Sequence, residues 1–505
     1  MSDVVIVGAG PTGLTLACEL ARRGLDVRVV DRSVAHGHGS RGKTLNPRSL
    51  EVLADLGVGE VVAAVGLTHL RYRKYYDGVR VSELDPFAEP GPTADAPYDG
   101  MLFLPQWRLE EILRDRLAAF GVKVELGTEL TGLRQADGKV AAAFAGGGRA
   151  ESRYLVGCDG GRSTVRKLLG VSFEGKTASE QSMICGDVEA DGLDPGVWHQ
   201  WFDREGAVLL SPFRDSRSWQ IQADVERDAD GTVLEPSLAG FQRRLDLRAG
   251  ETGVRLRNLT WSSTWRVNVR MVDRYRAGNV FLAGDAAHVH PIAGGLGMNT
   301  GIQDAWNLGW KLALAAGGRA GAELLDTYQE ERLPIAAWTL DFTGTLLDAV
   351  GEALEKPGVG LEKVVTDEGR GLRIGYRWSS LARGRGTHCL EPGDRAPDAP
   401  CHDRDGRAVR FFEVFAGPHF TLLGFGAGTA AAVRRLAGED VVGRVVEVDL
   451  IDSDRHARRA YGIDGDALVL VRPDNHVAMI TEASDADGVL GYLRDVGAVS
   501  GQQAA

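Results

Sequence analysis

The fold is decided by the stretch Val4-Val5-Ile6-Val7-Gly8-Ala9-Gly10-Pro11-Thr12-Gly13, in which an apolar run leads directly into a Gly-x-Gly-x-x-Gly turn. Each glycine meets a geometric need. Gly8 lets the chain turn sharply, Gly10 lets the backbone approach a pyrophosphate, and Gly13 lets the next helix pack against its strand. The helix predicted over residues 11–23 aims its N-terminus at that phosphate. The pattern predicts a dinucleotide-binding unit.

The next apolar run, residues 25–30, is typical of a second buried parallel strand, and it ends at Asp31. A carboxylate about 20 residues past the glycines can bind the hydroxyls of an adenosine ribose, and it disfavours a 2′-phosphate. The resident dinucleotide is therefore predicted not to be NADP. Arg32, the next residue, either reaches the adenosine or is an ordinary solvated surface arginine.

Composition narrows the class of protein. The chain has 505 residues, 44% of them hydrophobic and 25% charged, which is typical of a globule of about two to four domains. A net charge of -12 argues against nucleic acid or an anionic membrane as a partner. No apolar run reaches the length of a membrane span, and the first strand begins too early for a signal peptide. We therefore expect a cytoplasmic protein.

The five cysteines favour neither a disulfide framework nor a metal site. They form no C-x-x-C pair and no close zinc-ligand grouping, so we expect idle or buried thiols and no metal. They are Cys18, Cys158, Cys185, Cys389 and Cys401.

Residues 175–270 alternate between apolar and polar side chains and are rich in aromatic residues. This texture predicts an antiparallel sheet that forms one wall of an apolar cavity, and the alternative for each ring is ordinary sheet core. The aromatic residues in question are Trp198, Trp201, Phe202, Trp219, Trp261 and Trp265. As a group they favour a flat, apolar substrate.

A second glycine turn follows the strand predicted over residues 280–283. There Gly284-Asp285 is placed to accept hydrogen bonds from a sugar hydroxyl, the alternative being an ordinary turn cap, and residues 294–297 can lie flat against a ring. A helix predicted to begin near residues 298–300 would direct its positive end at a bound ring on which negative charge accumulates. His288 and His290 make an incomplete metal-ligand set, so we expect them to pack or to form hydrogen bonds.

With the turn at Asp159-Gly160, these ordered motifs resemble the class A FAD-dependent aromatic monooxygenases, which have the para-hydroxybenzoate hydroxylase-like fold. The chain is most similar to the subgroup that hydroxylates polycyclic aromatic polyketides in antibiotic biosynthesis. The resemblance implies that the first glycine turn holds the FAD pyrophosphate. It also implies that Asp159-Gly160 lies near flavin and nicotinamide, and that Gly284-Asp285 holds the ribityl chain.

The resemblance also marks individual residues. Arg41, Gln106 and Arg108 correspond to positions that contact the flavin or its adenosine half, and Leu130 to one beside the adenine. Glutamate is commoner than aspartate at position 31 in relatives. Together with the motifs, the predicted FAD-binding residues are Gly8, Gly10, Thr12, Gly13, Asp31, Arg32, Arg41, Gln106, Leu130, Asp159, Gly284, Asp285, Pro291, Gly295, Leu296, Gly297, Met298 and Asn299.

The predicted fold is α/β: a Rossmann-like FAD-binding domain interrupted by an antiparallel-sheet substrate domain, with a thioredoxin-like domain at the C-terminal end. We assign residues 1–70, 101–174 and 273–390 to the FAD-binding domain, the last with a helical region. Residues 71–100 are an insertion that belongs with the substrate domain of residues 175–272. The last domain is assigned to residues 391–505. Its start is placed there because the repeated prolines of residues 392–400 cannot continue regular structure. Cys401 has no partner cysteine, so this domain is expected to be a scaffold or an oligomer contact.

The activity that the resemblance implies is oxygenation of an aromatic, polycyclic polyketide-type phenol. NADPH or NADH reduces FAD as a transient co-substrate, and dioxygen then forms a flavin C4a-hydroperoxide that the ring attacks. Alternatives are hydroxylation of a small phenol, Baeyer-Villiger oxygenation, and a flavin-binding assembly partner without activity. We expect a monomer or a homodimer. The catalytic residues are unknown: a group that takes the phenol proton would help, and Tyr75, Tyr76, Asp187, His199 and Arg214 are possibilities, each better explained as structural.

Overall fold

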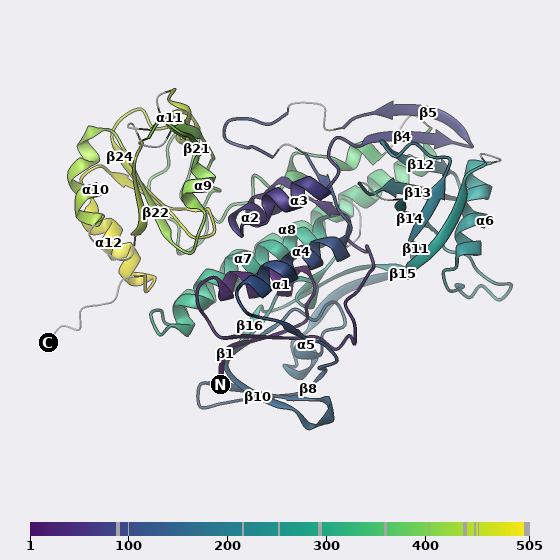
Figure 1. Ribbon diagram of the computed structural model, residues 1–505, viewed down its shortest axis with the longest axis horizontal. Coiled ribbons are helices and arrows are strands. Elements are labelled where there is room, and N and C mark those ends of the chain that lie inside the picture. The colour runs from purple at the N-terminus through teal and green to yellow at the C-terminus, as the bar shows by residue number, and fades with distance from the viewer. Residues whose placement is uncertain are drawn as a thin grey trace.

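The structure is a computed structural model of the chain. It describes residues 1–86, 91–98, 100–214, 217–250, 253–290, 295–357, 361–402, 405–437, 442–448, 451–452 and 454–498. Figure 1 shows a central part built on a sheet, a second sheet to one side of it, and a separate C-terminal part on the other. None of the helices in these ranges is both long and apolar enough to span a bilayer.

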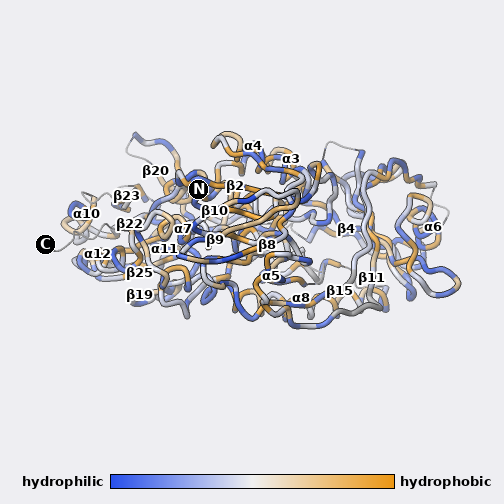
Figure 2. The backbone as a smooth tube through the Cα atoms, turned by 90° about the horizontal axis from the view of Figure 1, so that it is seen from below, coloured by the Kyte–Doolittle hydropathy of each residue, from blue (hydrophilic) through white to orange (hydrophobic). Residues whose placement is uncertain are grey.

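The central sheet contains the apolar runs noted in the sequence. Its inner strands run parallel and are covered on both faces, which is why their side chains are apolar on both. In Figure 2 hydrophobic stretches run through this region around β2 and β10. The strand order is β16 (Arg276–Ala277), β17 (Val280–Leu282), β10 (Arg149–Gly157), β1 (Ser2–Val7), β2 (Val27–Val30) and β7 (Val124–Glu125), with β9 (Lys139–Phe144) pairing with β10 and β8 (Leu130–Ala136) with β9.

Long helices cover this sheet. α1 (Pro11–Ala21) follows the first glycine turn and packs against both α4 (Gln106–Ala119) and α7 (Leu296–Ala316). α8 (Ala322–Glu355) packs on α7 and continues toward the second sheet (Figure 1). Through these contacts, α1 near the start of the chain and α7 and α8, about 300 residues later, belong to one packed core.

The second sheet is largely antiparallel and receives strands from two distant segments. α6 (Leu238–Ala249) packs on one face, whereas the opposite face meets the C-terminal half of α8. The strand order is β18 (His288–Val289), β15 (Arg255–Val272), β11 (Phe173–Asp191), β14 (Ser218–Asp224), β13 (Gly206–Pro212), β12 (Val197–Asp203), β4 (Arg71–Tyr76) and β5 (Val79–Leu84).

The C-terminal part has the thioredoxin-like arrangement that the sequence predicts. Its central strand β22 pairs in parallel with β23 and antiparallel with β24, which in turn pairs antiparallel with β25. The elements are β19 (Arg383–Gly384), β22 (Phe420–Phe425), α10 (Ala430–Leu436), β23 (Val442–Glu447), α11 (His456–Tyr461), β24 (Ala467–Val471), β25 (Val477–Glu482) and α12 (Ala486–Asp495).

Candidate active site

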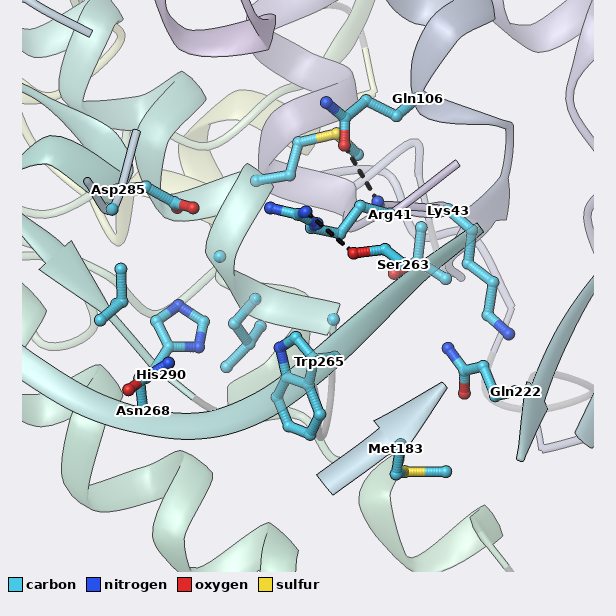
Figure 3. Close-up of a pocket in the computed structure, with 18 of the residues that line it drawn as sticks. Arg41, Lys43, Gln106, Met183, Gln222, Ser263, Trp265, Asn268, Asp285 and His290 are labelled. Atoms are coloured by element: carbon cyan, nitrogen blue, oxygen red, sulfur yellow. Dashed lines mark hydrogen bonds between the residues drawn. The ribbon is translucent and has the colours of Figure 1, made fainter. Parts of the chain in front are cut away.

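A cavity of about 1230 Å³ lies between the central sheet and the second sheet. Its lining includes the first glycine turn, the start of α7 and one face of the second sheet. Figure 3 shows the side chains between Asp285 and the second sheet. Of the residues predicted from the sequence, those that line it are Gly10, Thr12, Arg32, Arg41, Gln106, Asp159, Asp285, Gly295, Leu296, Gly297 and Met298. The structure therefore brings residues nearly 290 positions apart to one space.

The three glycines of the first turn differ in their surroundings. Gly8 has a φ of +108°, and a Cβ there would overlap the carbonyl oxygen of Cys158, the residue that follows β10. A Cβ at Gly13 would overlap the carbonyl oxygen of Gly8, so α1 approaches its strand closely only without a side chain. Gly10 has no atom within 4 Å of the Cβ position and faces the cavity. Its missing side chain leaves room for a ligand.

Asp31 is held in one orientation at the end of β2. Its two carboxylate oxygens accept the N–H groups of Ala9 and Ser33, each at 2.8 Å. A carboxylate oxygen accepts more than one hydrogen bond, so the group can still bind ribose hydroxyls. Arg32 is exposed and lines the cavity mouth.

Asp285 projects its carboxylate into the open cavity. Gly284 before it has a φ of +59°, a conformation that glycine adopts readily, and packs against Thr12. The carboxylate of Asp285 receives no hydrogen bond from the described residues, and the residue is exposed to the cavity that it lines. Burial raises its pKa, and His288 and Arg41 partly offset that effect. It is therefore an acceptor directed at whatever occupies the cavity.

The buried carboxylate of Asp304 on α7 holds the turn of Asp285 in place. It accepts the N–H of Gly284 at 3.0 Å, lies 2.7 Å from Nε2 of His288, and is paired with Arg332 at 2.7 Å. Nothing in the local sequence distinguished Asp304, because its partners come from three separate elements.

Helix α7 directs its N-terminus at the cavity. It begins at Leu296, two residues before the predicted start, with Gly295 as its N-cap at a φ of +64°. Its free N–H groups and positive dipole end therefore face the cavity. Asn299 does not line the cavity, because its side chain accepts the N–H of Asn46 and donates to the carbonyls of Thr44 and Gly295. Pro291 lies outside the described residues.

Arg41 and Gln106 lie over the cavity from its other side. Arg41 donates to Oγ of Ser263 on β15 at 3.2 Å and links the first domain segment to the second sheet. Gln106 accepts the N–H of Gly42 at 3.0 Å and donates to Glu110 at 2.8 Å. In Figure 3 both side chains lie beside the N-terminal end of α7.

Two predicted residues have evident structural contacts. Asp159 lines the cavity, but its carboxylate accepts a hydrogen bond from the Ser163 hydroxyl at 2.5 Å. It also accepts the N–H groups of Thr164 and Val165, at the start of a short helix. Leu130 is only 3% exposed and belongs to the apolar core instead of the cavity lining.

The register of the second sheet decides which aromatic residues reach the cavity. Along β12, Trp198 and Phe202 face it, whereas Trp201 packs on the opposite face with Trp219. Trp265 of β15 joins the cavity wall. The cavity wall is thus aromatic, as predicted. Trp201 and Trp219 do not belong to it, because they pack in the core on the other face of the sheet.

Comparison with known proteins identifies the family. Residues 1–343 match the family model described as FAD binding domain, and residues 390–496 match that of the aromatic-ring hydroxylase C-terminal domain. The chain belongs to the FAD-dependent aromatic-ring hydroxylases. The resemblance seen in the sequence is confirmed.

Individual relatives match this hydroxylase over nearly its whole length. A flavin-dependent monooxygenase of Mycobacteroides abscessus is 41% identical over 98% of this chain and 99% of its own. The 6-methylpretetramide 4-monooxygenase of Streptomyces rimosus is 35% identical over 94% and 90%. The solved ternary complex of aklavinone-11 hydroxylase with FAD and aklavinone has a TM-score of 0.82 at 30% identity, covering 98% of both chains.

The residues of this hydroxylase fit an extended FAD. The open space at Gly10, the carboxylate of Asp285 and the N-terminus of α7 all border one cavity, where the family resemblance would place the pyrophosphate, the ribityl chain and the flavin ring respectively. The cavity continues past them to the aromatic wall. FAD and a second organic molecule therefore have adjoining places.

The possible proton acceptors considered from the sequence do not line the cavity of the hydroxylase. The hydroxyl of Tyr75 is hydrogen-bonded to His199, and Tyr76 donates a hydrogen bond to the carbonyl of Leu354. Burial lowers the pKa of His199 to about 4. Asp187 accepts the N–H of Ser40, and Arg214 donates to the carbonyl of Gly66.

The polar side chains that do face the substrate end were missed in the sequence. They include Lys43 and Gln222; Ser263 and Asn268 are further polar residues of the cavity lining, and Asn268 lies beside His290 (Figure 3). The alternation along β14 could have placed Gln222 on the face of Trp198. Lys43 gave no such signal, because it stands in a connecting segment whose position depends on distant strands.

Proposed function

We propose that this hydroxylase uses NADPH or NADH and dioxygen to hydroxylate an aromatic, polycyclic polyketide-type phenol. One observation carries the proposal: a single cavity joins Thr12, Asp285 and Met298 to an aromatic wall that contains Trp198 and Trp265. A cofactor bound along the first group has its reactive ring directed at a substrate lying on the second.

Bound FAD supplies the redox chemistry, by the C4a-hydroperoxide route expected from the resemblance. The protein's part is to bind, orient and shield. The positive end of α7 favours negative charge beside it, and Trp198, Phe202 and Trp265 exclude water from the substrate side.

The aromatic wall and two relatives support a substrate of several rings. The cavity of about 1230 Å³ holds FAD as well as the substrate, and beyond the FAD-binding residues Trp198, Phe202 and Trp265 offer a flat apolar surface. The names of two relatives, a 6-methylpretetramide monooxygenase and an aklavinone hydroxylase, specify polycyclic compounds. Small-phenol hydroxylation and Baeyer-Villiger oxygenation remain the alternatives.

The test is substrate-stimulated oxidation of NADPH and NADH by the FAD-loaded protein, with product analysis. We expect hydroxylated anthraquinones and naphthacenequinones to stimulate nicotinamide consumption and to yield hydroxylated product, and phenol or resorcinol to do so far less. Equal or better turnover of the single-ring compounds would favour the small-phenol alternative, and a ring-expanded ester or lactone product would favour the Baeyer-Villiger one.

A further inference from the structure

Lys43 is a buried lysine whose amine has no hydrogen-bond or ion-pair partner in the part of the chain that the structure describes. The residue is 9% exposed and lines the cavity, and its Nζ forms neither a hydrogen bond nor an ion pair. It lies 4.2 Å from the centre of the Trp198 ring. Burying a charged group without a partner costs several kcal/mol, so such a group needs an explanation.

Other buried lysines of this chain show what a structural lysine looks like here. Lys311 is paired with Glu331 at 2.6 Å and donates to Asn307 at 2.9 Å. Lys74 donates to the carbonyls of Ala353 and Lys356 at the end of α8. Lys43 differs from both because its amine is directed at the cavity.

The second sheet carries further polar groups on the face that also bears Trp198. Gln200 and Gln222 stand in one cross-strand row, since Leu209 pairs with both. Gln200 is fully buried and neither amide atom has a partner in the described structure, whereas Gln222 lines the cavity. In Figure 3 Lys43 and Gln222 lie at the same end of the cavity, on the far side of it from Asp285. The aromatic wall thus has one polar end, away from the ribityl site.

Two titratable groups face Lys43, both from β11. The Cys185 thiol has its pKa raised by burial to about 11, so it is neutral near pH 7. Burial raises the pKa of Asp187 to about 6, and this carboxylate accepts the N–H of Ser40. Neither forms an ion pair with Lys43. Burial lowers the pKa of Lys43 to about 7, although both groups act in the opposite direction.

We propose that Lys43 binds the phenolic oxygen of the substrate and holds it as a phenolate at the polar end of the cavity. This inference rests on the proposed function. The neutral amine accepts the phenolic proton: the O–H bond breaks, an N–H bond forms, and the resulting ammonium stays paired with the phenolate. A phenolate ring is a stronger nucleophile toward an electrophilic oxygen, and the pairing fixes which part of the ring faces the flavin.

The test uses FAD-loaded protein and alizarin, a dihydroxyanthraquinone whose neutral and phenolate forms differ in colour. Difference spectra are recorded through a pH titration for wild type, Lys43→Met and the matched control Lys123→Met, which alters an exposed lysine. We expect wild type and the control to bind alizarin as phenolate below the pH at which it ionises in water. Lys43→Met should bind it neutral, and bind the phenolate about tenfold more weakly or worse.

Flavin content and thermal stability separate this role from a structural one. Because the amine makes no hydrogen bond with any residue that the structure describes, Lys43→Met should keep both the flavin content and the thermal stability at the wild-type level. The proposal is overturned if wild type binds alizarin only as the neutral phenol or does not bind it, or if Lys43→Met matches wild type at every pH.

Turnover distinguishes the two proposals. A wild type that oxygenates phenols, with Lys43→Met unchanged in kcat, KM and pH profile, defeats the role of Lys43 alone. A wild type that shows Lys43-dependent phenolate binding but oxygenates no phenol defeats the proposed function alone.

Discussion

At the scale of single residues, Asp285 is the side chain most clearly available to the cofactor. Its carboxylate faces the cavity and has no hydrogen-bond partner among the residues that the structure describes, so its removal should leave the fold intact. Hydrogen bonds to a charged group contribute about 1.5–3 kcal/mol, so we expect Asp285→Ala to weaken FAD binding by roughly 10- to 100-fold. Titration of the apoprotein with FAD, followed by flavin fluorescence, measures this.

Asp115→Ala is the matched control for that change, because Asp115 is an exposed carboxylate on α4. It should bind FAD as wild type does. FAD retained at wild-type affinity by Asp285→Ala would remove Asp285 from the cofactor site.

At the scale of elements, the strand-turn-helix unit depends on two glycines for different reasons. A Cβ at Gly13 would overlap the backbone of Gly8, so Gly13→Ala should destabilise the apoprotein by about 3 kcal/mol, as overpacking does. Gly10 has open space and extended backbone, so Gly10→Ala should change apoprotein stability by less than about 1 kcal/mol and still hinder FAD. Urea unfolding of the apoproteins and FAD titration give the two readouts.

The two variants should differ in opposite ways: Gly13→Ala should lower apoprotein stability, whereas Gly10→Ala should lower FAD affinity. Gly10→Ala with unchanged FAD affinity would show that the pyrophosphate does not approach this turn, and an unaffected apoprotein stability in Gly13→Ala would contradict the packing of α1.

At the scale of the whole molecule, a buried ionic network joins the C-terminal part to the helices of the FAD-binding part. Arg472, just after β24, forms ion pairs with Glu331 on α8 at 2.6 Å and with Asp474. Glu331 forms a second ion pair, with Lys311. Burial alone would raise the pKa of Glu331, but Arg472 and Lys311 outweigh it and the pKa is depressed. The network therefore couples the stabilities of the two parts.

Glu331→Gln strands Arg472 and Lys311 without their shared carboxylate. Removing one member of a buried pair costs about 3–5 kcal/mol, and we expect that loss in the free energy of unfolding at pH 7. Since the folded-state pKa of Glu331 is lowered, its contribution is present above the unfolded pKa of about 4.3 and is lost as pH falls below it. Unfolding in urea across pH should show a flatter acid limb for the variant.

Arg435→Met is the control within the C-terminal part, because it removes an ion pair with Asp487 at the surface. It should change stability little. If Glu331→Gln were as stable as wild type at pH 7, the network would not hold the two parts together.

Much of this architecture was predictable because its signals are local. The glycine turn at Gly8, the strand before Gly284 and the α/β order of the C-terminal part depend on neighbouring residues, and the structure has them in the expected order. The start of α7 was misjudged by two residues, since its N-cap is a left-handed glycine, Gly295, whose conformation packs against Thr44.

The substrate side depended on contacts that local sequence does not contain. Alternation along β12 separates Trp198 from Trp201, but which of them faces the cavity follows from the pairing of distant strands and from α6. Lys43 and Asp304 are important for the same reason: their burial and partners come from elements far away in the chain.

In the function proposed above, this hydroxylase transfers oxygen from dioxygen to the ring of a polycyclic phenol lying on the aromatic wall. The most direct test of this function is mass spectrometry of the product formed by FAD-loaded protein with NADPH or NADH, a stimulating polycyclic phenol and heavy-isotope dioxygen. We predict one labelled oxygen atom in a new ring hydroxyl of each product molecule. Nicotinamide consumption that yields only hydrogen peroxide, or a hydroxyl whose oxygen comes from water, would contradict the account.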